Sequence, residues 1–230
     1  MYGNKKISCV IPCHNEEEGL EKILRDKPAC IDEVIVVDNH STDNTAEVAR
    51  KNGSTVVFEE KKGYGYAYQA GLPKASGDII VMLDGDSSYP LTEVEKSLAY
   101  MKAQNLDFFA GCRYPLTDKN SQPPINQAAN CFFSWLIRIL FGINLRDSQS
   151  GLMAFKKDIL DKIMVDNPGM AFSQEIKIKA FLNKGIKCGS QHVFYIPRVG
   201  KSKFRKIQDS MNTISSVVRM RKRLSMHRTS

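Results

Sequence analysis

Two aspartates separated by one glycine follow a run of apolar residues in the stretch IIVMLDGDSSYP, residues 79–90. The apolar run is typical of a strand buried on both faces, so Asp84 and Asp86 lie where that strand ends. Carboxylates this close raise each other's pKa unless a cation lies between them. Mg²⁺ and Mn²⁺ prefer oxygen ligands, and Mg²⁺ completes its shell with water and substrate phosphates. The motif therefore predicts a Mg²⁺ or Mn²⁺ site that neutralises a departing diphosphate, with Asp84 and Asp86 as ligands.

Polar residues also follow two earlier apolar runs, at residues 7–12 and 33–38. The residues at these ends are Pro12, Asn15, Glu16, Asp38 and Asn39. In open parallel sheets, ligands bind beyond the carboxyl ends of the strands. Each polar residue taken alone is also explained as a helix cap or the start of a turn. Three polar strand ends on one rim predict a binding cleft.

The elements that position these residues alternate between strands and helices. Strands are expected at residues 7–12, 33–38, 54–60, 78–84 and 106–112, with helices from about Glu16, over 41–53, within 63–75 and over 91–104. Ser41 or Thr42 is the expected N-cap of the second helix. This alternation predicts an α/β fold with a mostly parallel central sheet flanked by helices.

The second half of the chain has a different pattern. It is expected to hold a polar loop at 118–127, an apolar helix at 128–143, a strand and a helix within 150–163, a helix at 172–185 and a late strand at 187–197. The 128–143 helix is interpreted as mostly core, with an apolar face lying on a bilayer surface as the alternative.

The basic charge is concentrated at the carboxyl end of the chain. The 230 residues carry a net charge of +8, and residues 198–230 hold ten Lys or Arg and one acid, a net +9. Residues 204–224 predict a basic amphipathic helix with one apolar face, made of Ile207, Met211, Ile214 and Val218. Such a helix predicts binding to an anionic surface, either the headgroups of a membrane or a nucleic-acid backbone.

Length and cysteine pattern bound the class of protein. The expected organisation is one domain at 1–205, followed by a helical tail at 206–230. The six cysteines form no CxxC pair, which favours buried thiols and no disulfide-linked partner. The first residues lack a signal-peptide pattern, and no apolar stretch is long enough for a membrane span. The expected location is the cytoplasm, with peripheral association at the cytoplasmic face of a membrane.

Several motifs together resemble family 2 glycosyltransferases of the GT-A fold, in the group of dolichol-phosphate mannosyltransferase and other polyprenyl-phosphate sugar transferases. The matching segments, in chain order from about residue 7 to 205, are VIPCHNEE, VVDNHSTDNT, GYGYAYQAG, LDGDSSYP, GCRY, DSQSGLMAF and GMAFSQEIKIKA. The resemblance implies transfer of a sugar from a nucleotide-diphosphate sugar, with inversion at the anomeric carbon. It also implies that residues 1–205 form the catalytic domain, with a nucleotide-sugar half at about 1–115 and an acceptor half at about 116–205.

The resemblance also implies roles for individual residues. The implied nucleotide-sugar contacts are Pro12, Asn15, Glu16, Asp38, Asn39, Ser41, Lys62, Gly63, Asp84, Gly85, Ser202 and Lys203. Asp86 would bind the metal, and Arg113 would lie near the diphosphate or the acceptor. The segment RVGKSKF (198–204) resembles a loop that closes over the diphosphate, where Lys203 would bind phosphate as a point charge.

The implied acceptor is a polyprenyl phosphate, and its implied contacts are Asn130, Asp147, Ser150 and Gly151. The chain departs from the family pattern near Gln127 and at Met153, where relatives often carry arginines linked to the lipid phosphate. The alternative acceptor is a hydroxyl on a glycan or a modified DNA base, with Glu175 as general base. Glu175 is otherwise explained as a helix-start acid favoured by the helix dipole.

Three other classes of protein explain less of the sequence. A nicotinamide-dependent oxidoreductase needs G-x-G-x-x-G after the first strand, but the glycines at 63, 65 and 71 follow the third strand. An aspartyl-phosphate phosphatase with Asp84 as nucleophile leaves the Asp38 segment without a role. A non-enzymatic membrane or nucleic-acid binding module accounts for the basic tail but not for the three aspartates.

Overall fold

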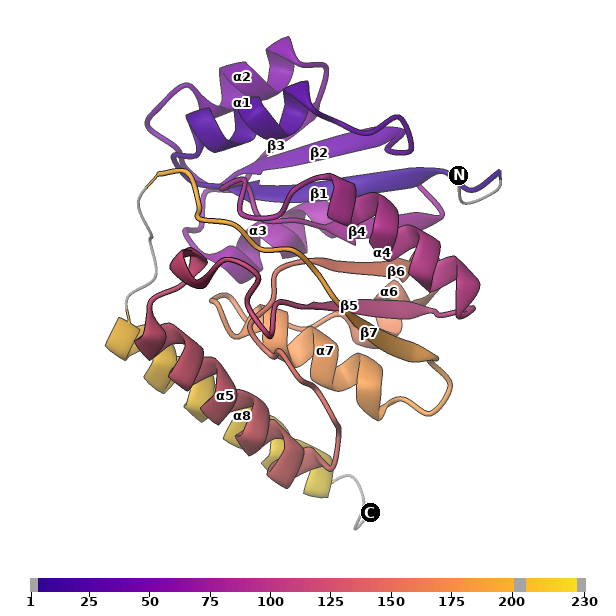
Figure 1. Ribbon diagram of the computed structural model, residues 1–230, viewed down its shortest axis with the longest axis vertical. Helices are drawn as coiled ribbons and strands as arrows, with labels where there is room; N and C mark the ends of the chain where they lie inside the picture. Colours follow the sequence, from indigo (N-terminus) through magenta and orange to yellow (C-terminus); the bar gives the residue numbers. More distant parts are fainter. Residues whose placement is uncertain (1–3, 201–205, 227–230) are drawn as a thin grey trace.

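Figure 1 shows the computed structural model of the chain, which describes residues 4–200 and 206–226. Its centre is a seven-stranded sheet in the order β3-β2-β1-β4-β6-β5-β7. The strands are β1 (Ile7–Cys13), β2 (Glu33–Asp38), β3 (Thr55–Phe58), β4 (Ile79–Met82), β5 (Phe108–Cys112), β6 (Met153–Lys156) and β7 (Cys188–His192). The predicted α/β class with a mostly parallel sheet is confirmed.

Eight α-helices connect and cover the described strands. They are α1 (Glu17–Arg25), α2 (Thr45–Lys51), α3 (Tyr64–Gly71), α4 (Thr92–Ala103), α5 (Pro124–Phe141), α6 (Leu160–Ile163), α7 (Phe172–Leu182) and α8 (Lys206–Met226). The expected N-cap of α2 is wrong, because this helix begins at Thr45, after Asn44. Ser41 and Thr42 lie in the preceding turn, where their backbone amides donate to the side chains of Asp38 and Asn15.

One described strand runs against all the others. β6 pairs antiparallel with β4 and with β5, whereas β1, β2, β3, β4, β5 and β7 run in one direction. The carboxyl ends of β1, β2, β4 and β5 therefore meet at one edge, and the chain also enters β6 from that edge. We call this the site edge.

The sheet is covered on both faces because its central strands are largely apolar and buried, as in β4 and β5. In β1, Cys9 and Ile11 join one core cluster, which α1, α2 and α4 cover, and Val10 joins the other, which α3, α6 and α7 cover. Successive strand side chains point to opposite faces, so a continuous apolar run serves both layers. This packing fixes the strand ends and the residues that follow them.

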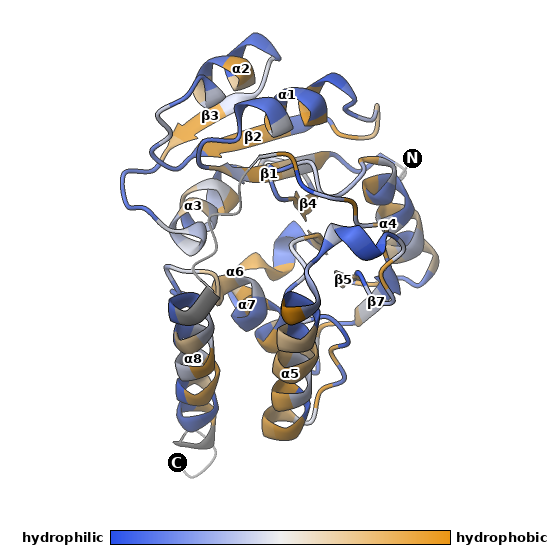
Figure 2. Ribbon diagram, turned by 60° about the vertical axis from the view of Figure 1, so that its left-hand side comes forward, coloured by the Kyte–Doolittle hydropathy of each residue, from blue (hydrophilic) through white to orange (hydrophobic). Residues whose placement is uncertain are grey.

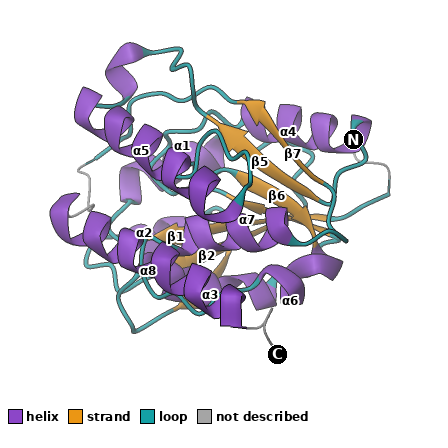
Figure 3. Cartoon of the chain, turned by 90° about the horizontal axis from the view of Figure 1, so that it is seen from below, coloured by secondary structure: helices purple, strands orange, loops and turns teal. Residues whose placement is uncertain are grey.

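A third, smaller cluster joins α5, α7 and α8 beside the sheet. Ile137, Ile178 and Val217 form its buried centre, and Figure 3 shows the three helices together from below. The apolar face of α8 expected to lie on an anionic surface is not the face that packs on the domain, and its described residues remain exposed. The helix buries Thr213, Ser216 and Val217 instead, because α5 and α7 offer both polar and apolar partners.

Helix α5 departs from expectation at its start and in its burial. It begins at Pro124, inside the expected polar loop, because a proline is favoured in the first turn of a helix. Only one side of it is core, and the other side exposes a row of large apolar side chains, which is the orange helix of Figure 2. We define the α5 apolar face as Ile125, Phe132, Trp135 and Ile139, whose side chains are 46–64% exposed. None of the helices in residues 4–200 and 206–226 is long and apolar enough to cross a membrane.

Candidate active site

The turns after β1 and β2 hold each other through side chains at the site edge. The Asn15 amide oxygen accepts from the Thr42 backbone N–H at 2.7 Å, and the Asn15 N–H donates to Ser41 Oγ at 3.0 Å. The Ser41 N–H in turn donates to Asp38 Oδ1 at 2.9 Å. The structure thus brings Asn15, Asp38 and Ser41 together, directly after Pro12 and the strand ends.

Asn39 connects the end of β2 to the glycine turn before α3. Its amide oxygen accepts from the Gly63 N–H at 2.7 Å, and its amide nitrogen donates to the Glu59 and Lys61 carbonyls at 3.1 and 2.8 Å. Both ends of the Asn39 amide therefore hold residues 59–63 in place. Lys62 is exposed in this turn, so its amine faces solvent at the site edge.

Asp84 lies just beyond β4, in a closely fitted position. The Tyr64 hydroxyl donates to its Oδ1 at 3.0 Å. A Cβ on Gly151 would lie 2.0 Å from Asp84 Oδ2, so only glycine leaves room for this carboxylate. Burial, followed by repulsion from Asp86, raises the pKa of Asp84 to about 6. A carboxylate held in this way gains from a nearby cation.

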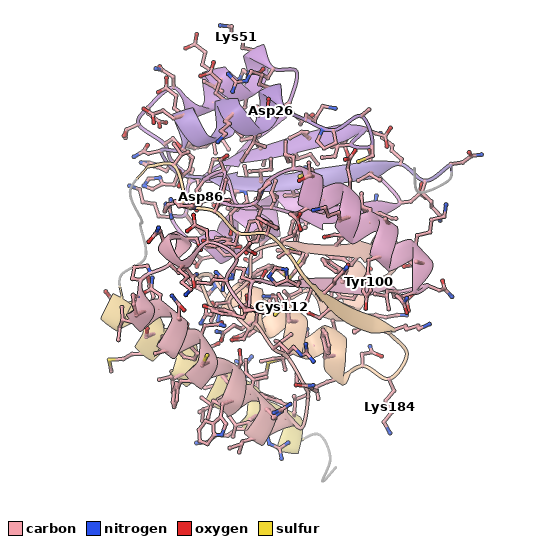
Figure 4. The ribbon with its side chains drawn as sticks, in the orientation of Figure 1. Asp26, Lys51, Asp86, Tyr100, Cys112 and Lys184 are labelled. Carbon is pink, nitrogen blue, oxygen red and sulfur yellow. The ribbon has the colours of Figure 1, made fainter. Side chains whose placement is uncertain are left out.

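Asp86, which is labelled in Figure 4, is buried, and it is paired with a cation from the segment that follows edge strand β7. Its Oδ2 lies 3.2 Å from Arg198 Nη1, and its Oδ1 accepts from the Ser88 N–H at 3.0 Å. Arg198 Nη2 also donates to Glu16 Oε1 at 2.9 Å. One guanidinium therefore joins the carboxylates that follow β1 and β4.

The two aspartates suit a hard divalent cation. Gly85 between them has no room for a side chain, because a Cβ would lie 2.6 Å from the Cys13 sulfur. The guanidinium on Asp86 shows that this position accepts a positive charge, and a cation would also reduce the repulsion between Asp84 and Asp86. Within the described residues no cluster of three or more His, Cys, Asp or Glu side chains could hold a metal. A pair of carboxylates leaves most of the coordination shell to water and phosphate oxygens.

Arg113 and Asp147 form a buried ion pair on the β5 side of the site edge. The guanidinium donates from Nε to Oδ2 at 2.7 Å and from Nη2 to Oδ1 at 2.9 Å, and the Arg113 backbone N–H donates to the same carboxylate. Burial alone would raise the pKa of Asp147, but the Arg113 charge outweighs it and holds this pKa below its ordinary value. Tyr195 lies against the guanidinium, 5.1 Å from its carbon to the ring centroid.

The segment 147–151 is held from below by a buried lysine. Lys177 Nζ donates to the carbonyl oxygens of Ser148 and Ser150. Burial lowers the pKa of Lys177 to about 7. From above, the Tyr89 hydroxyl accepts from the Gly151 N–H at 2.9 Å and lies 3.1 Å from Ser150 Oγ. Gly151 is therefore fixed against Asp84 from two sides.

The remaining acceptor-side residues lie where helices meet this segment. Asn130 on α5 accepts from the Gln149 N–H at 3.2 Å, and its buried amide nitrogen has no hydrogen-bond partner in the protein. Glu175 on α7 accepts from the Asn167 amide at 2.8 Å and from the Ser216 hydroxyl of α8. The Glu175 carboxylate is thus a contact point between α7 and α8.

Sequence reasoning missed several residues of the site. It placed Arg198 in a basic tail and in the loop RVGKSKF, without a contact of its own. It placed Tyr64 in an aromatic run that packs or stacks around the nucleotide, and it gave Lys177 no role. The late strand expected at 187–197 ends at His192, and residues 193–199 continue as an extended segment that places Arg198 beside Asp86. Ser202 and Lys203 lie outside the described residues.

Comparison with known proteins covers most of the chain. The family described as Glycosyl transferase family 2 matches residues 8–164. An uncharacterized glycosyltransferase of Mycobacterium tuberculosis is 32% identical over 198 residues, which cover 86% of this chain and 88% of that protein. A dolichyl-phosphate hexose transferase of Haloferax volcanii is 29% identical over 206 residues, covering 88% of each chain.

Two further similarities concern length and fold. A low-salt glycan biosynthesis hexosyltransferase of Haloferax volcanii is 29% identical over 210 residues, and the chain spans only 51% of its length. The structure of glucosyl-3-phosphoglycerate synthase from Mycobacterium tuberculosis, in complex with uridine diphosphate, superimposes with a TM-score of 0.78 at 20% identity. That match covers 95% of this chain and 81% of that one, so the two proteins share a fold.

Proposed function

The chain belongs to glycosyl transferase family 2, and from this premise we propose that it transfers a sugar from a nucleotide-diphosphate sugar to a polyprenyl phosphate at a membrane surface. The observation that carries the donor half of the proposal is the convergence of Asp38, Asp84 and Asp86 at one sheet edge. Ligands of open parallel sheets bind at this position.

The residues after β1 and β2 would bind the nucleoside. Asp38 and its turn offer a carboxylate and short hydrogen-bonding side chains that would meet a base and ribose. The exposed Lys62 and the amide of Gly63 lie on the same rim and would meet the diphosphate or ribose. Ser202 and Lys203 keep their expected role at the diphosphate as part of the proposal.

Asp84 and Asp86 would hold Mg²⁺ or Mn²⁺ together with the diphosphate oxygens. The ion would supply charge neutralisation for the departing nucleoside diphosphate. The protein holds Asp84 through Tyr64 and Gly151, so this carboxylate needs little reorganisation when charge develops. In the proposal the acceptor attacks from the side of segment 147–151, with inversion.

A phosphate acceptor is favoured over a hydroxyl acceptor. A phosphate is already an anion and needs no general base, whereas a hydroxyl needs one. The obvious candidate, Glu175, is bound by Asn167 and Ser216 at the junction with α8. Similar proteins include one named dolichyl-phosphate hexose transferase and, in Pyrococcus furiosus, one named dolichol-phosphate mannosyltransferase, which is 26% identical over 212 residues.

The α5 apolar face supports work at a membrane surface. Phe132 and Trp135 lie next to each other on it, with ring centroids 6.0 Å apart, and aromatic side chains are favoured at membrane interfaces. The adjacent helix α8 exposes Arg219, Arg221, Lys222 and Arg223 near its end. Exposed apolar and basic side chains on neighbouring helices are the combination that binds anionic bilayers.

Transfer is tested with a panel of nucleotide-diphosphate sugars and a polyprenyl phosphate in detergent, with Mn²⁺ or Mg²⁺. We expect one donor to give a lipid-linked sugar, and we expect Asp86→Ala to abolish the product while the thermal transition is retained. Product formation in excess chelator, or full activity of Asp86→Ala, would rule out the metal role. A sugar transferred to a hydroxyl acceptor but never to the lipid phosphate would rule out the proposed acceptor.

Membrane binding is tested through the chain's single tryptophan, Trp135, which is 55% exposed on the α5 apolar face. Vesicles with anionic lipid should shift its fluorescence to shorter wavelength. Phe132→Ser with Ile139→Ser should weaken vesicle binding at least about tenfold, because burying each side chain is worth about 1.5–3 kcal/mol. The matched control is Phe58→Ser, which removes a side chain 57% exposed on edge strand β3. Equal binding of all three proteins would contradict the proposed surface.

A further inference from the structure

Arg198 supplies a positive charge to two largely buried carboxylates at the site edge. It contacts Asp86 Oδ2 at 3.2 Å and Glu16 Oε1 at 2.9 Å, and its side chain is 27% exposed while those of Asp86 and Glu16 are 11% and 10% exposed. The two terminal nitrogens of the guanidinium therefore contact the two carboxylates, and the buried Nε–H has no hydrogen-bond partner in the protein.

The backbone holds Arg198 in this place. The extended segment after β7 crosses the site edge in Figure 1, where the Ile196 N–H donates to the Ser88 carbonyl at 2.9 Å and the Val199 N–H donates to the Asp86 carbonyl at 2.9 Å. These bonds join the segment to Asp86, the last residue of the D-x-D motif, and to Ser88 just after it. The backbone on both sides of Arg198 is therefore fixed to the backbone around Asp86, so the side-chain contact is part of the fold.

We propose that Arg198 is an internal counter-ion that a divalent cation must displace from Asp86. The guanidinium and the cation need the same carboxylate, and two positive charges at one oxygen repel each other. The displaced guanidinium then has the donors of Nε and Nη1 unused, beside the proposed position of the diphosphate. Planar guanidinium groups bind phosphate oxygens in pairs, so the nucleotide diphosphate becomes the new partner of Arg198.

This exchange couples two ligands at one site, and it rests on the proposed function for the identity of the second ligand. A metal ion alone must break the Arg198–Asp86 contact without compensation, so it binds weakly. A nucleoside diphosphate takes up the displaced guanidinium, so it raises the affinity for the metal, and the metal raises its affinity by the same factor.

The experiment measures Mn²⁺ binding by the loss of the free-ion electron paramagnetic resonance signal. Wild type, Arg198→Gln and Arg198→Lys are titrated with Mn²⁺ alone and in the presence of uridine or guanosine diphosphate, with correction for Mn²⁺ bound by free nucleotide. Without nucleotide, Arg198→Gln should bind Mn²⁺ about tenfold more tightly than wild type, within the usual range of coupling factors. The nucleotide should then add little further affinity in this variant, while Arg198→Lys should behave more like wild type.

The matched control is Lys156→Gln. Lys156 ends β6 at the sheet edge opposite the site edge, with its amine 2.7 Å from the Asp107 carboxylate, so its removal should leave Mn²⁺ affinity unchanged. Thermal transitions of all variants check folding, and Arg198→Gln should have a lower transition temperature than wild type that Mn²⁺ restores.

The outcomes separate this inference from the proposed function. If Arg198→Gln binds Mn²⁺ alone no more tightly than wild type, or if neither protein binds Mn²⁺ with or without nucleotide, the counter-ion role is wrong even where sugar transfer is observed. If the variant binds Mn²⁺ more tightly but no nucleotide diphosphate changes the affinity of any protein, the displacement stands and the proposed donor is wrong.

Discussion

Polar groups are held in two different ways along the site edge. On the β1 and β2 side, Asn15, Asp38 and Ser41 connect through single hydrogen bonds to backbone amides of short turns. On the β5 side, Arg113 and Asp147 form a buried two-bond ion pair. A single hydrogen bond in a turn is easily exchanged for one to a ligand, whereas a broken buried ion pair leaves a charge unpaired.

The difference indicates a division of labour between the two sides. The β1–β2 side is able to rearrange around a nucleotide, because its contacts are weak and individually replaceable. The β5 side acts as a fixed wall, because its charges are satisfied inside the protein and are joined to the fold through Lys177 and segment 147–151. The predictions below test this contrast.

The largest expected effect is a loss of stability when the buried ion pair of the β5 side is broken. Asp147→Asn should lower the free energy of unfolding by about 3–5 kcal/mol, because it leaves the Arg113 guanidinium buried without a counter-charge. Urea denaturation measures the change. Asp38→Asn, on the other side, should cost less than about 1 kcal/mol, since it loses one hydrogen bond at most. Similar losses for the two variants would remove the proposed contrast, and the double variant Arg113→Met with Asp147→Leu should recover much of the loss.

A second effect, on the order of 2 kcal/mol, concerns Asp84 at the boundary between the two sides. Its pKa is raised to about 6, so the folded protein holds this proton more tightly than the unfolded chain. The stabilising contribution is present below about pH 4 and is lost as the pH rises through 6. In metal-free buffer, Asp84→Asn should therefore become more stable than wild type between pH 4 and 7.

The measurement for Asp84 is the difference in the free energy of unfolding between the two proteins as a function of pH. Mn²⁺ added at pH 7 should reduce the advantage of the Asn variant, because it supplies the missing positive charge to wild type. A difference that does not change with pH would show that burial of this carboxylate carries no cost.

The third prediction concerns the exchangeable side. Asp38→Ala should weaken binding of the nucleotide-diphosphate sugar that the protein uses by about 1–3 kcal/mol, the scale of a hydrogen bond to a charged group. Isothermal titration calorimetry measures this loss. Unchanged affinity for every nucleotide sugar that wild type binds would exclude Asp38 from the nucleotide site.

The smallest expected effect is a difference in stability between changes on the buried face and on the exposed face of α8. Val217→Ala should destabilise the protein by about 1 kcal/mol, since it removes buried methyl groups from the α5–α7–α8 cluster. Met211→Ser should change stability little, because Met211 is 65% exposed. Thermal denaturation compares the two, and a larger loss for Met211→Ser would mean that the other face of α8 carries the packing.

The parallel half of the fold was predictable because its signals are local. Each strand there is an apolar run that ends in polar residues, and parallel strands place those ends on one rim. The positions of Asp38, Asp84 and Asp86 follow from that rule alone. The Gly-rich turn and the helix after it also lie where the pattern predicted them.

The contacts that were missed join residues far apart in the chain. The bond between Arg198 and Glu16 spans 182 residues, and no local pattern distinguishes that arginine from the other basic residues near the carboxyl end. The buried face of α8 was missed for a related reason. Periodicity in the sequence shows the apolar stripe of α8, but not which face meets the domain. In the structure Ser216 binds Glu175 on α7, so the face that contains Ser216 is buried.

The direction of β6 has a consequence for how the specificity of this enzyme can change. The chain leaves the sheet after β5 and returns into β6 at the same edge, so residues 113–152, with α5, form one excursion that begins and ends at the site. An insertion or exchange within this excursion alters one wall of the site without changing the order or pairing of any strand. The segment is a natural unit for grafting between relatives, with the nucleotide side left as a constant frame.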